Sequence, residues 1–384
     1  MSTSAHPGPP PATGAWQEGD PPGARRFFTS TRPLPLELTG ELPEFTLAHE
    51  TWGTLAPDRS NAVLVLHALT GDSHLAGAAG PGHPSPGWWD ALVGPGRPLD
   101  TDRWFVVAPN VLGGCQGSTG PASPSPLPGA GGRPWGSAFP RLTQRDQVAA
   151  EARLADSLGI DRWHCVIGGS MGGMRALEWA ATAPDRVRAL CLLACPAAAS
   201  AEQIAWASLQ IRAVRDDPGW HGGDYHRLPD GHGPHRGLGT ARRIAHLTYR
   251  TEPELQTRFG RAAQPGEDPT RGGRHQVESY LDHQADKLVR RFDAGSYVTL
   301  AEAMNTHDVG RGRGGTTAAL RRLRSPALVV GVDTDRLYPP AQQAALAAAM
   351  PDAELRLLRS DHGHDGFLVE TEQVGTHLRE VLSR

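Results

Sequence analysis

The sequence predicts an α/β protein, with a mostly parallel β-sheet covered by helices on both faces and a helical insertion late in the chain. Short, continuous apolar runs alternate with longer segments of helical period. Such continuous runs are typical of parallel strands that are buried on both faces. At 384 residues the chain is long for one domain, but large α/β domains with insertions reach this size.

The candidate strands and helices follow one another in regular alternation. Strand-like runs lie at residues 62–69, 104–110, 163–169, 189–195, 327–333 and 353–360. Helical patterns lie at residues 143–159, 172–184, 340–350 and 371–382. This order is typical of strands joined by crossover helices in a parallel sheet. We therefore expect a core made of residues 26–195 and 316–384.

Residues 196–315 interrupt the alternation. Helical composition recurs there at residues 201–217, 240–259 and 275–292, between loops rich in Gly, Pro and His, without a comparable strand pattern. The segment predicts a helical lid inserted into the core. Residues 114–140 read as one long irregular surface loop, and loops of that length are often functional.

The first 25 residues are rich in Pro and Gly, with few side chains that could offset the entropy lost on ordering. We expect residues 1–25 to form a disordered tail. The stretch lacks the apolar centre of a signal peptide, and no later apolar run could span a bilayer. The expected location is the cytoplasm, away from membranes.

The charge pattern favours a small-molecule partner. A net charge of −3 without a Lys/Arg block gives no footprint for nucleic acid or an anionic membrane. Lys287 is the only lysine, and we attribute the preference for arginine elsewhere to codon bias. Three of the four cysteines lie in apolar runs, where a thiol behaves as a small hydrophobe, so no disulfide framework is predicted.

The stretch "VIGGSMGGM", residues 166–174, surrounds Ser170 with four glycines and fits G-x-S-x-G. A strand that enters the serine and a helix that leaves it must turn within one or two residues, a strained geometry that only small neighbours tolerate. The turn exposes the hydroxyl, and the N–H of Met171 can stabilise an oxyanion beside it. A phosphate-binding turn is the alternative, but the G-x-G-x-x-G and Walker patterns are both missing. The motif predicts a nucleophile elbow and the α/β-hydrolase fold.

A nucleophilic serine in this fold is followed along the chain by an acid and then a histidine. Asp335 follows the strand 327–333, at the sheet edge where catalytic loops gather, and is the expected acid. Asp333 is expected to stabilise the loop, although an exchange of roles between the two aspartates stays open. His364 is the expected general base, and His362 is expected to be solvated.

The loop after the first predicted strand is the place for a second oxyanion donor, and the amide of Leu69 is the candidate. His67 and His74, in the same loop, are interpreted as packed or surface histidines without chemistry. The His/Asp cluster near residue 364 has no third anchor with zinc spacing, so no metal is expected.

Taken together, these residues belong to a longer pattern: the chain resembles the homoserine O-acetyltransferases, a family of α/β-hydrolase-fold enzymes. The resemblance spans nearly everything from about residue 43 to 370, in segments such as "HALTGDSH", "NVLGGCQGSTGP", "IGGSMGGMRALEWA" and "THDVGRG". Gly366 departs from it, since a small alanine is expected there. The N-terminal extension and the 121–140 loop look longer than is usual in the family.

The resemblance implies an activity. An acetyl group would pass from acetyl-CoA to the side-chain hydroxyl of L-homoserine, in methionine biosynthesis, by a ping-pong mechanism through an acetyl-serine. It implies Ser170, Asp335 and His364 as the triad, in agreement with the fold reasoning. No cofactor is implied beyond acetyl-CoA as co-substrate, and the expected partners are acetyl-CoA, L-homoserine and a second copy in a homodimer.

The resemblance also assigns the amino-acid substrate. Arg242 would hold its carboxylate, which suits a planar guanidinium, and Asp365 would hold its ammonium, with Tyr249 a weaker candidate. From the residues alone, Arg242 reads as a surface charge on a helix. A succinyl-CoA donor, a serine or other alcohol acceptor, and a plain esterase or thioesterase stay open.

Overall fold

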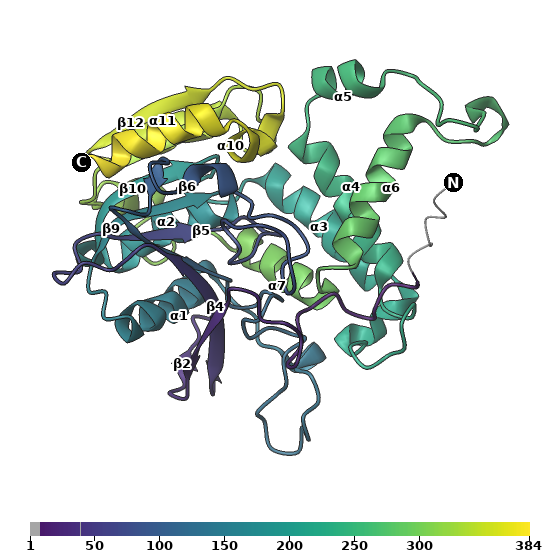
Figure 1. The fold of residues 1–384 in the computed structure, drawn as a ribbon, viewed down its shortest axis with the longest axis horizontal. Coiled ribbons are helices and arrows are strands. Elements are labelled where there is room, and N and C mark those ends of the chain that lie inside the picture. The colour runs from purple at the N-terminus through teal and green to yellow at the C-terminus, as the bar shows by residue number, and fades with distance from the viewer. Residues whose placement is uncertain (1–7, 39) are drawn as a thin grey trace.

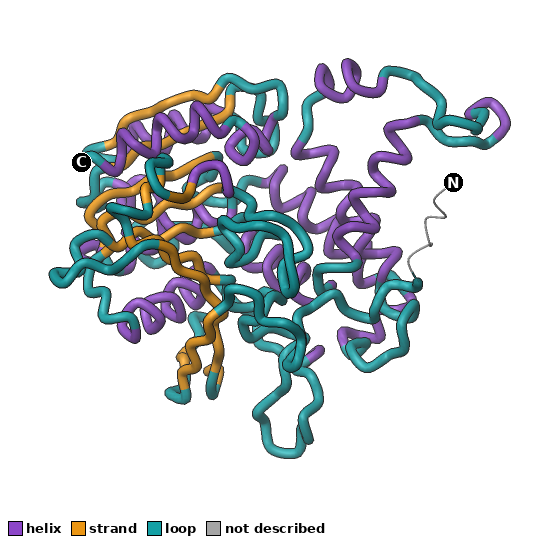
Figure 2. The backbone as a smooth tube through the Cα atoms, in the orientation of Figure 1, coloured by secondary structure: helices purple, strands orange, loops and turns teal. Residues whose placement is uncertain are grey.

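The computed structural model describes residues 8–38 and 40–384, and its core is an eight-stranded sheet in the order β1-β4-β8-β5-β9-β10-β11-β12 (Figures 1 and 2). The strands are β1 Arg26–Ser30, β4 Phe45–Trp52, β5 Ala62–Leu66, β8 Phe105–Pro109, β9 Trp163–Gly169, β10 Val187–Leu193, β11 Ala327–Val332 and β12 Ala353–Leu358. Neighbours from β8 to β12 are parallel, whereas β1 and β4 run antiparallel at one edge. The fold class predicted from the sequence is confirmed.

Every predicted strand is a strand of this sheet, but the sequence missed the antiparallel edge. β4 carries His49 and Glu50 among its buried residues, so it lacks the continuous apolar run that marked the others. The short pairs β2 Leu34–Pro35 with β3 Glu41–Leu42, and β6 Val93–Gly94 with β7 Leu99–Asp100, lie outside the main sheet.

Helices cover both faces of the sheet because its strands bury side chains on both. In β5, Leu64 and Leu66 join one apolar cluster, and Val63 and Val65 join the other. The first cluster includes residues of α1 Gln144–Ser157, α2 Met171–Thr182 and α9 Pro340–Ala349, and the second includes residues of α11 Thr371–Leu382. The short helices α8 Thr316–Leu320 and α10 Gly366–Val369 connect these elements.

The segment between β10 and α8 is helical and lies beside the sheet (Figure 1). Its helices are α3 Ala201–Arg215, α4 His235–Tyr249, α5 Glu252–Phe259, α6 Gln276–Val289 and α7 Ala294–Asn305. The sequence pattern predicted one helix over 240–259, but two form, because Thr251 leaves helical geometry and caps α5 with its hydroxyl. α4 packs against both α3 and α6.

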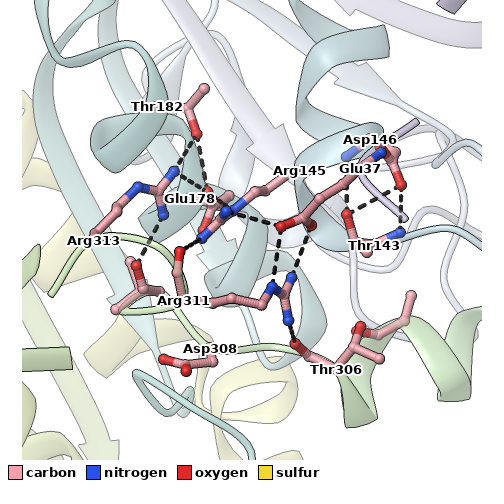
Figure 3. A network of polar contacts seen from close by, with 12 residues as sticks. Glu37, Thr143, Arg145, Asp146, Glu178, Thr182, Thr306, Asp308, Arg311 and Arg313 are labelled. Carbon is pink, nitrogen blue, oxygen red and sulfur yellow. Dashed lines mark hydrogen bonds and ion pairs between the residues drawn. The ribbon is translucent and has the colours of Figure 1, made fainter. Parts of the chain in front are cut away.

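Charged side chains fix the end of this helical segment to the core, as Figure 3 shows. Arg311 pairs with Glu37 at 2.8 Å, and Arg145 of α1 reaches both Glu37, at 2.8 Å, and Glu178 of α2, at 2.9 Å. Arg313 also contacts Glu178, at 2.5 Å. Part of the "THDVGRG" motif, residues 306–312, is therefore structural: Arg311, together with the nearby Arg313, joins the loop after α7 to the core.

The N-terminal segment differs from the prediction of a disordered tail. Residues 1–7 lie outside the described residues, but from residue 8 the chain packs between the helical insertion and the core. Thr13 Oγ1 donates to Asp293 at 2.8 Å, and the amide of Trp16 donates to the carbonyl of Cys115 at 2.9 Å. The prediction was wrong because it counted side chains, whereas this segment is held largely through its own backbone. Its prolines also have little entropy to lose on ordering.

All four cysteines are buried and unpaired, and burial raises the pKa of Cys191 and Cys195 to about 12. Among the described residues, no helix combines the length and the apolar character that crossing a bilayer requires.

Candidate active site

Ser170 lies at a sharp turn between β9 and α2. Its φ of 53° and ψ of −122° are a strained combination for a residue with a side chain. The glycines around it have a different role, since none of the four has a positive φ. A Cβ on Gly168 would meet the backbone of Gly172, and a Cβ on Gly172 would meet the carbonyl of Leu66. The glycines therefore allow β5, β9 and α2 to approach closely enough to hold the serine in its turn.

Three predicted residues meet above the carboxyl ends of β9, β11 and β12. His364 Nε2 lies 2.9 Å from Ser170 Oγ, and His364 Nδ1 lies 2.7 Å from Asp335 Oδ2. The other oxygen of Asp335 accepts the amides of Leu337 and Tyr338, each at 2.9 Å, so the carboxylate is held from both sides. Ser170, His364 and Asp335 thus form a hydrogen-bonded series, and all three side chains are buried.

The neighbouring aspartate and histidine take other places. Asp333 accepts the amide of Ser360 at 3.1 Å and pairs with Arg359, which is the loop-stabilising position expected for it. The side chain of His362 is 40% exposed and lies 3.7 Å from Glu254. The structure thus places Asp335 and His364, and not Asp333 and His362, in the hydrogen-bonded series with Ser170.

A cavity of about 130 Å³ opens at Ser170 and His364. Arg242, Tyr249 and Asp365 line it, as does Leu69. Its remaining walls are Ala68, Thr70, Met304, Leu337, Phe367 and Leu368.

The cavity carries one cation and one carboxylate on its walls. Arg242 Nη1 lies 3.4 Å from Thr70 Oγ1, and its buried Nε has no partner among the described residues. Asp365 Oδ2 lies 3.2 Å from Arg250 Nη2. Burial raises the pKa of Asp365, and the charge of Arg250 opposes that rise. These groups are complementary to a small molecule with an anionic and a cationic end.

Two backbone amides are the predicted oxyanion donors. Met171 is the first residue of α2, so its N–H belongs to the positive end of the helix dipole. Leu69 lines the same cavity as Ser170, and its N–H donates to no backbone or side-chain acceptor among the described residues. The first donor thus adjoins the serine in the chain, and the second lies on the cavity wall.

A buried ion pair behind the Leu69 loop was missed by the sequence analysis. Arg175 of α2 contacts Glu151 of α1 at 2.5 Å and donates to the carbonyl of His67 at 2.8 Å. Trp179 donates to the same carboxylate at 2.8 Å. A charged residue in the apolar run "GGMRALEWA" was the available signal.

His67 completes this support from within the loop. Burial and the nearby Arg175 lower the pKa of His67 to about 3, so its ring is neutral and its Nε2 accepts the amide of Val111 at 3.0 Å. The prediction that His67 is a packed histidine fits this arrangement. Tyr338, also missed, lies with its ring 5.0 Å from that of His364.

A second histidine cluster lies close to the same loop. Glu50, His74 and His83 bring their ligand-type atoms within 4.8 Å of one another. His74 Nδ1 lies 3.0 Å from the carboxylate, and His83 Nε2 accepts the amide of Ala24 at 3.2 Å. These contacts join the three residues in a hydrogen-bonded unit, in which the buried Nε2 of His74 has no partner among the described residues.

Known proteins resemble this chain in both sequence and fold. The sequence profile of the α/β hydrolase fold matches residues 61–371. A homoserine O-acetyltransferase of Thermobifida fusca is 64% identical over 377 residues, covering 98% of each chain. The crystal structure of homoserine O-acetyltransferase from Bacillus anthracis has a TM-score of 0.85 at 26% identity, covering 94% of this chain and 97% of that one. Esterase E22 has a TM-score of 0.84 at 25% identity, covering 93% and 99%. With a full-length relative at this identity and the fold profile matched across its core, the chain belongs to the homoserine O-acetyltransferase family of α/β-hydrolase-fold enzymes.

Proposed function

We propose that the protein transfers an acetyl group from acetyl-CoA to the side-chain hydroxyl of L-homoserine, as a step of methionine biosynthesis. The observation that carries the proposal is the series Ser170, His364 and Asp335, opening on a cavity that holds Arg242 and Asp365. The activity for which the family is named has homoserine as the acceptor. The cavity's two charges suit the carboxylate and ammonium of such an amino acid.

In the first half of the reaction, His364 takes the proton of Ser170, and the serine oxygen attacks the thioester carbonyl carbon. The amides of Leu69 and Met171 stabilise the resulting oxyanion. When the carbon–sulfur bond breaks, the proton on His364 passes to the CoA sulfur. An acetyl ester on Ser170 remains.

In the second half, the hydroxyl of homoserine loses its proton to His364 and attacks the acetyl carbon. Arg242 holds the substrate carboxylate and Asp365 its ammonium, which fixes the hydroxyl near the ester. The bond to Ser170 breaks, the serine oxygen recovers the proton from His364, and O-acetyl-L-homoserine leaves. Asp335 orients the imidazole and stabilises its charged form in both halves.

A burst experiment tests the proposal. Acetyl-CoA mixed with enzyme alone should release CoA in an amount equal to the enzyme and then almost stop, because the narrow cavity disfavours attack by water. Homoserine should restore turnover. Ser170→Ala should remove the burst. Absence of any burst in the unaltered enzyme would refute the acetyl-serine intermediate.

An acetyl esterase is the second candidate, because esterase E22 has nearly the same fold over almost all of its length. Continued rapid release of CoA without homoserine would favour the esterase.

Assays that cross acetyl-CoA and succinyl-CoA with homoserine and serine show which acyl donor and which acceptor the enzyme prefers. All four pairs must be measured, since each pocket contact that decides between them is worth only about 1–3 kcal/mol.

We also propose that the chain forms a homodimer through its helical insertion. Ile204 and Leu209 of α3 and Leu247 of α4 are exposed, Leu209 to 54%. Large apolar side chains exposed on a surface favour burial against a partner. Sedimentation of the purified protein measures its mass; a value of 41.0 kDa at all concentrations would exclude the dimer.

A further inference from the structure

A second cavity, of about 220 Å³, adjoins the catalytic one. The two share Ala68, Thr70, Arg242 and Leu368 as walls. The second cavity therefore lies directly beyond walls of the catalytic one. No step of the proposed chemistry takes place there.

The second cavity is lined by basic groups. Besides Arg242, its walls include Lys287 of α6 and Arg291, which lies just after the end of that helix. Arg291 Nη1 donates to the carbonyl of Thr70 at 3.0 Å, so it is fixed to the wall that the two cavities share. Asp72 is the acid on the walls, and its carboxylate accepts the amide of His74 at 2.9 Å.

Lys287 differs from these arginines because its ammonium enters no hydrogen bond or ion pair among the residues that the structure describes. It is exposed at the cavity's rim. Trp88, half-buried, presents an aromatic ring to the same cavity. A free cation and an aromatic ring beside a fixed arginine fit a ligand that carries phosphate and a flat base.

The composition of the chain supports a role for this lysine. Among 38 lysine and arginine residues, Lys287 is the one lysine. Codon bias explains why the other basic residues are arginine, but it does not explain why residue 287 is a lysine. An ammonium differs from a guanidinium as a compact point charge with three rotatable donors, and in that form it is a common phosphate binder.

We propose that the second cavity binds the phosphate-bearing end of CoA, with Lys287 contacting a phosphate. The inference rests on the proposed acetyl-CoA donor. In that donor the phosphates are separated from the thioester by the whole pantetheine arm, so the groups that bind them must lie outside the catalytic cavity and open into it. The second cavity lies outside the catalytic one and shares four wall residues with it, which is the position that such groups require.

The variant Lys287→Met tests the proposal with two acetyl donors, acetyl-CoA and S-acetylpantetheine. Both have the pantetheine arm, and they differ only in the phosphate-bearing end. We expect the KM for acetyl-CoA to rise about five- to tenfold, as for the loss of one charge-assisted contact. The KM for S-acetylpantetheine, which has no phosphate at that end, should not change. Lys287→Arg keeps the charge but replaces the compact ammonium by a planar guanidinium, so it should raise this KM less than Lys287→Met does. The matched control is Arg290→Met, which removes a neighbouring exposed charge whose Nη2 donates to the carbonyl of Gly8.

Acetyl-3′-dephospho-CoA identifies the phosphate. If Lys287→Met has no effect with this donor, the lysine contacts the 3′-phosphate; if the effect persists, it contacts the pyrophosphate. Equal increases of KM for acetyl-CoA and S-acetylpantetheine, or an unchanged KM for acetyl-CoA, would overturn the proposed subsite. Failure of every donor with the unaltered enzyme would instead refute the acetyltransferase function, so the two failures are distinguishable.

Discussion

Asp365 combines a structural contact with a proposed role in substrate binding. It faces the catalytic cavity and contacts Arg250 at 3.2 Å, while burial raises its pKa. Only the ionised carboxylate attracts the substrate ammonium. Because its pKa is raised above the ordinary value of 3.8, protonation begins at a higher pH than for an exposed aspartate.

This gives a prediction about pH. The KM for homoserine should rise as the pH falls through the raised pKa of Asp365, and the size of the acetyl-CoA burst should change less. Asp365→Asn should raise the KM about tenfold or more and remove this pH dependence, as for a lost bond to a charged group. Steady-state kinetics between neutral and mildly acidic pH measure the KM for homoserine in the unaltered enzyme and in the variant. A KM that stays pH-dependent in the variant would assign the effect to another group.

Residues of the triad could be predicted from the sequence because each follows a recognisable strand. Ser170 comes directly after β9, and Asp335 and His364 lie in the loops that follow β11 and β12; the parallel sheet brings those ends to one edge. Tyr338 could not be found in this way, since an aromatic residue in a loop has no pattern that points to a cavity.

At the scale of elements, the loop after β5 depends on helices α1 and α2. Glu151 and Arg175 join the two helices, and Arg175 holds the His67 carbonyl two residues before Leu69. The pair is fully buried, so its loss leaves an uncompensated charge. Such a pair is invisible to pattern analysis because its members lie 24 residues apart and meet only in the fold.

Glu151→Gln should therefore lower both stability and catalysis. We expect the free energy of unfolding to fall by about 3 kcal/mol, as for breaking a buried ion pair. In the folded fraction, kcat should fall more than the KM for homoserine rises, because the shifted loop displaces the Leu69 amide. Urea unfolding and steady-state kinetics measure the two effects.

Asp156→Asn is the matched control, since it removes an exposed carboxylate from the same helix, one that pairs with Arg186. The free energy of unfolding of this variant should fall by less than about 1 kcal/mol, as is typical for the loss of a surface ion pair. Equal effects of the two variants would contradict the proposed support of the loop.

For the whole molecule, the N-terminal segment connects the helical insertion to the core. Asp293, before α7, accepts Thr13 and also Tyr225, at 2.6 Å, while Trp16 bonds to Cys115. Burial would raise the pKa of Asp293, but its contact with His226 and the hydrogen bonds from Tyr225 and the amide of Ser296 lower it to about 2, so the carboxylate is ionised. The composition of the N-terminal segment could not predict that the segment is ordered, because its hydrogen-bond partners lie far along the chain.

A variant that begins at residue 18 should loosen the insertion. The free energy of unfolding should fall by about 1–3 kcal/mol, from several lost hydrogen bonds. Amide exchange should accelerate most around residues 288–296. Thr13→Ala removes only the hydrogen bond to Asp293, so it should reproduce part of the faster amide exchange, and only near Asp293. Exchange that is the same in the shortened and full chains would show that the segment does not support the insertion.

The size of the catalytic cavity has a consequence for kinetics. At about 130 Å³ it has little room for the pantetheine tip and an amino acid together. In the proposed reaction the two substrates would occupy it in turn, and each could enter the form of the enzyme that awaits the other. Excess homoserine would then block unacetylated Ser170 from its donor, and competitive substrate inhibition at high homoserine would follow from the geometry alone.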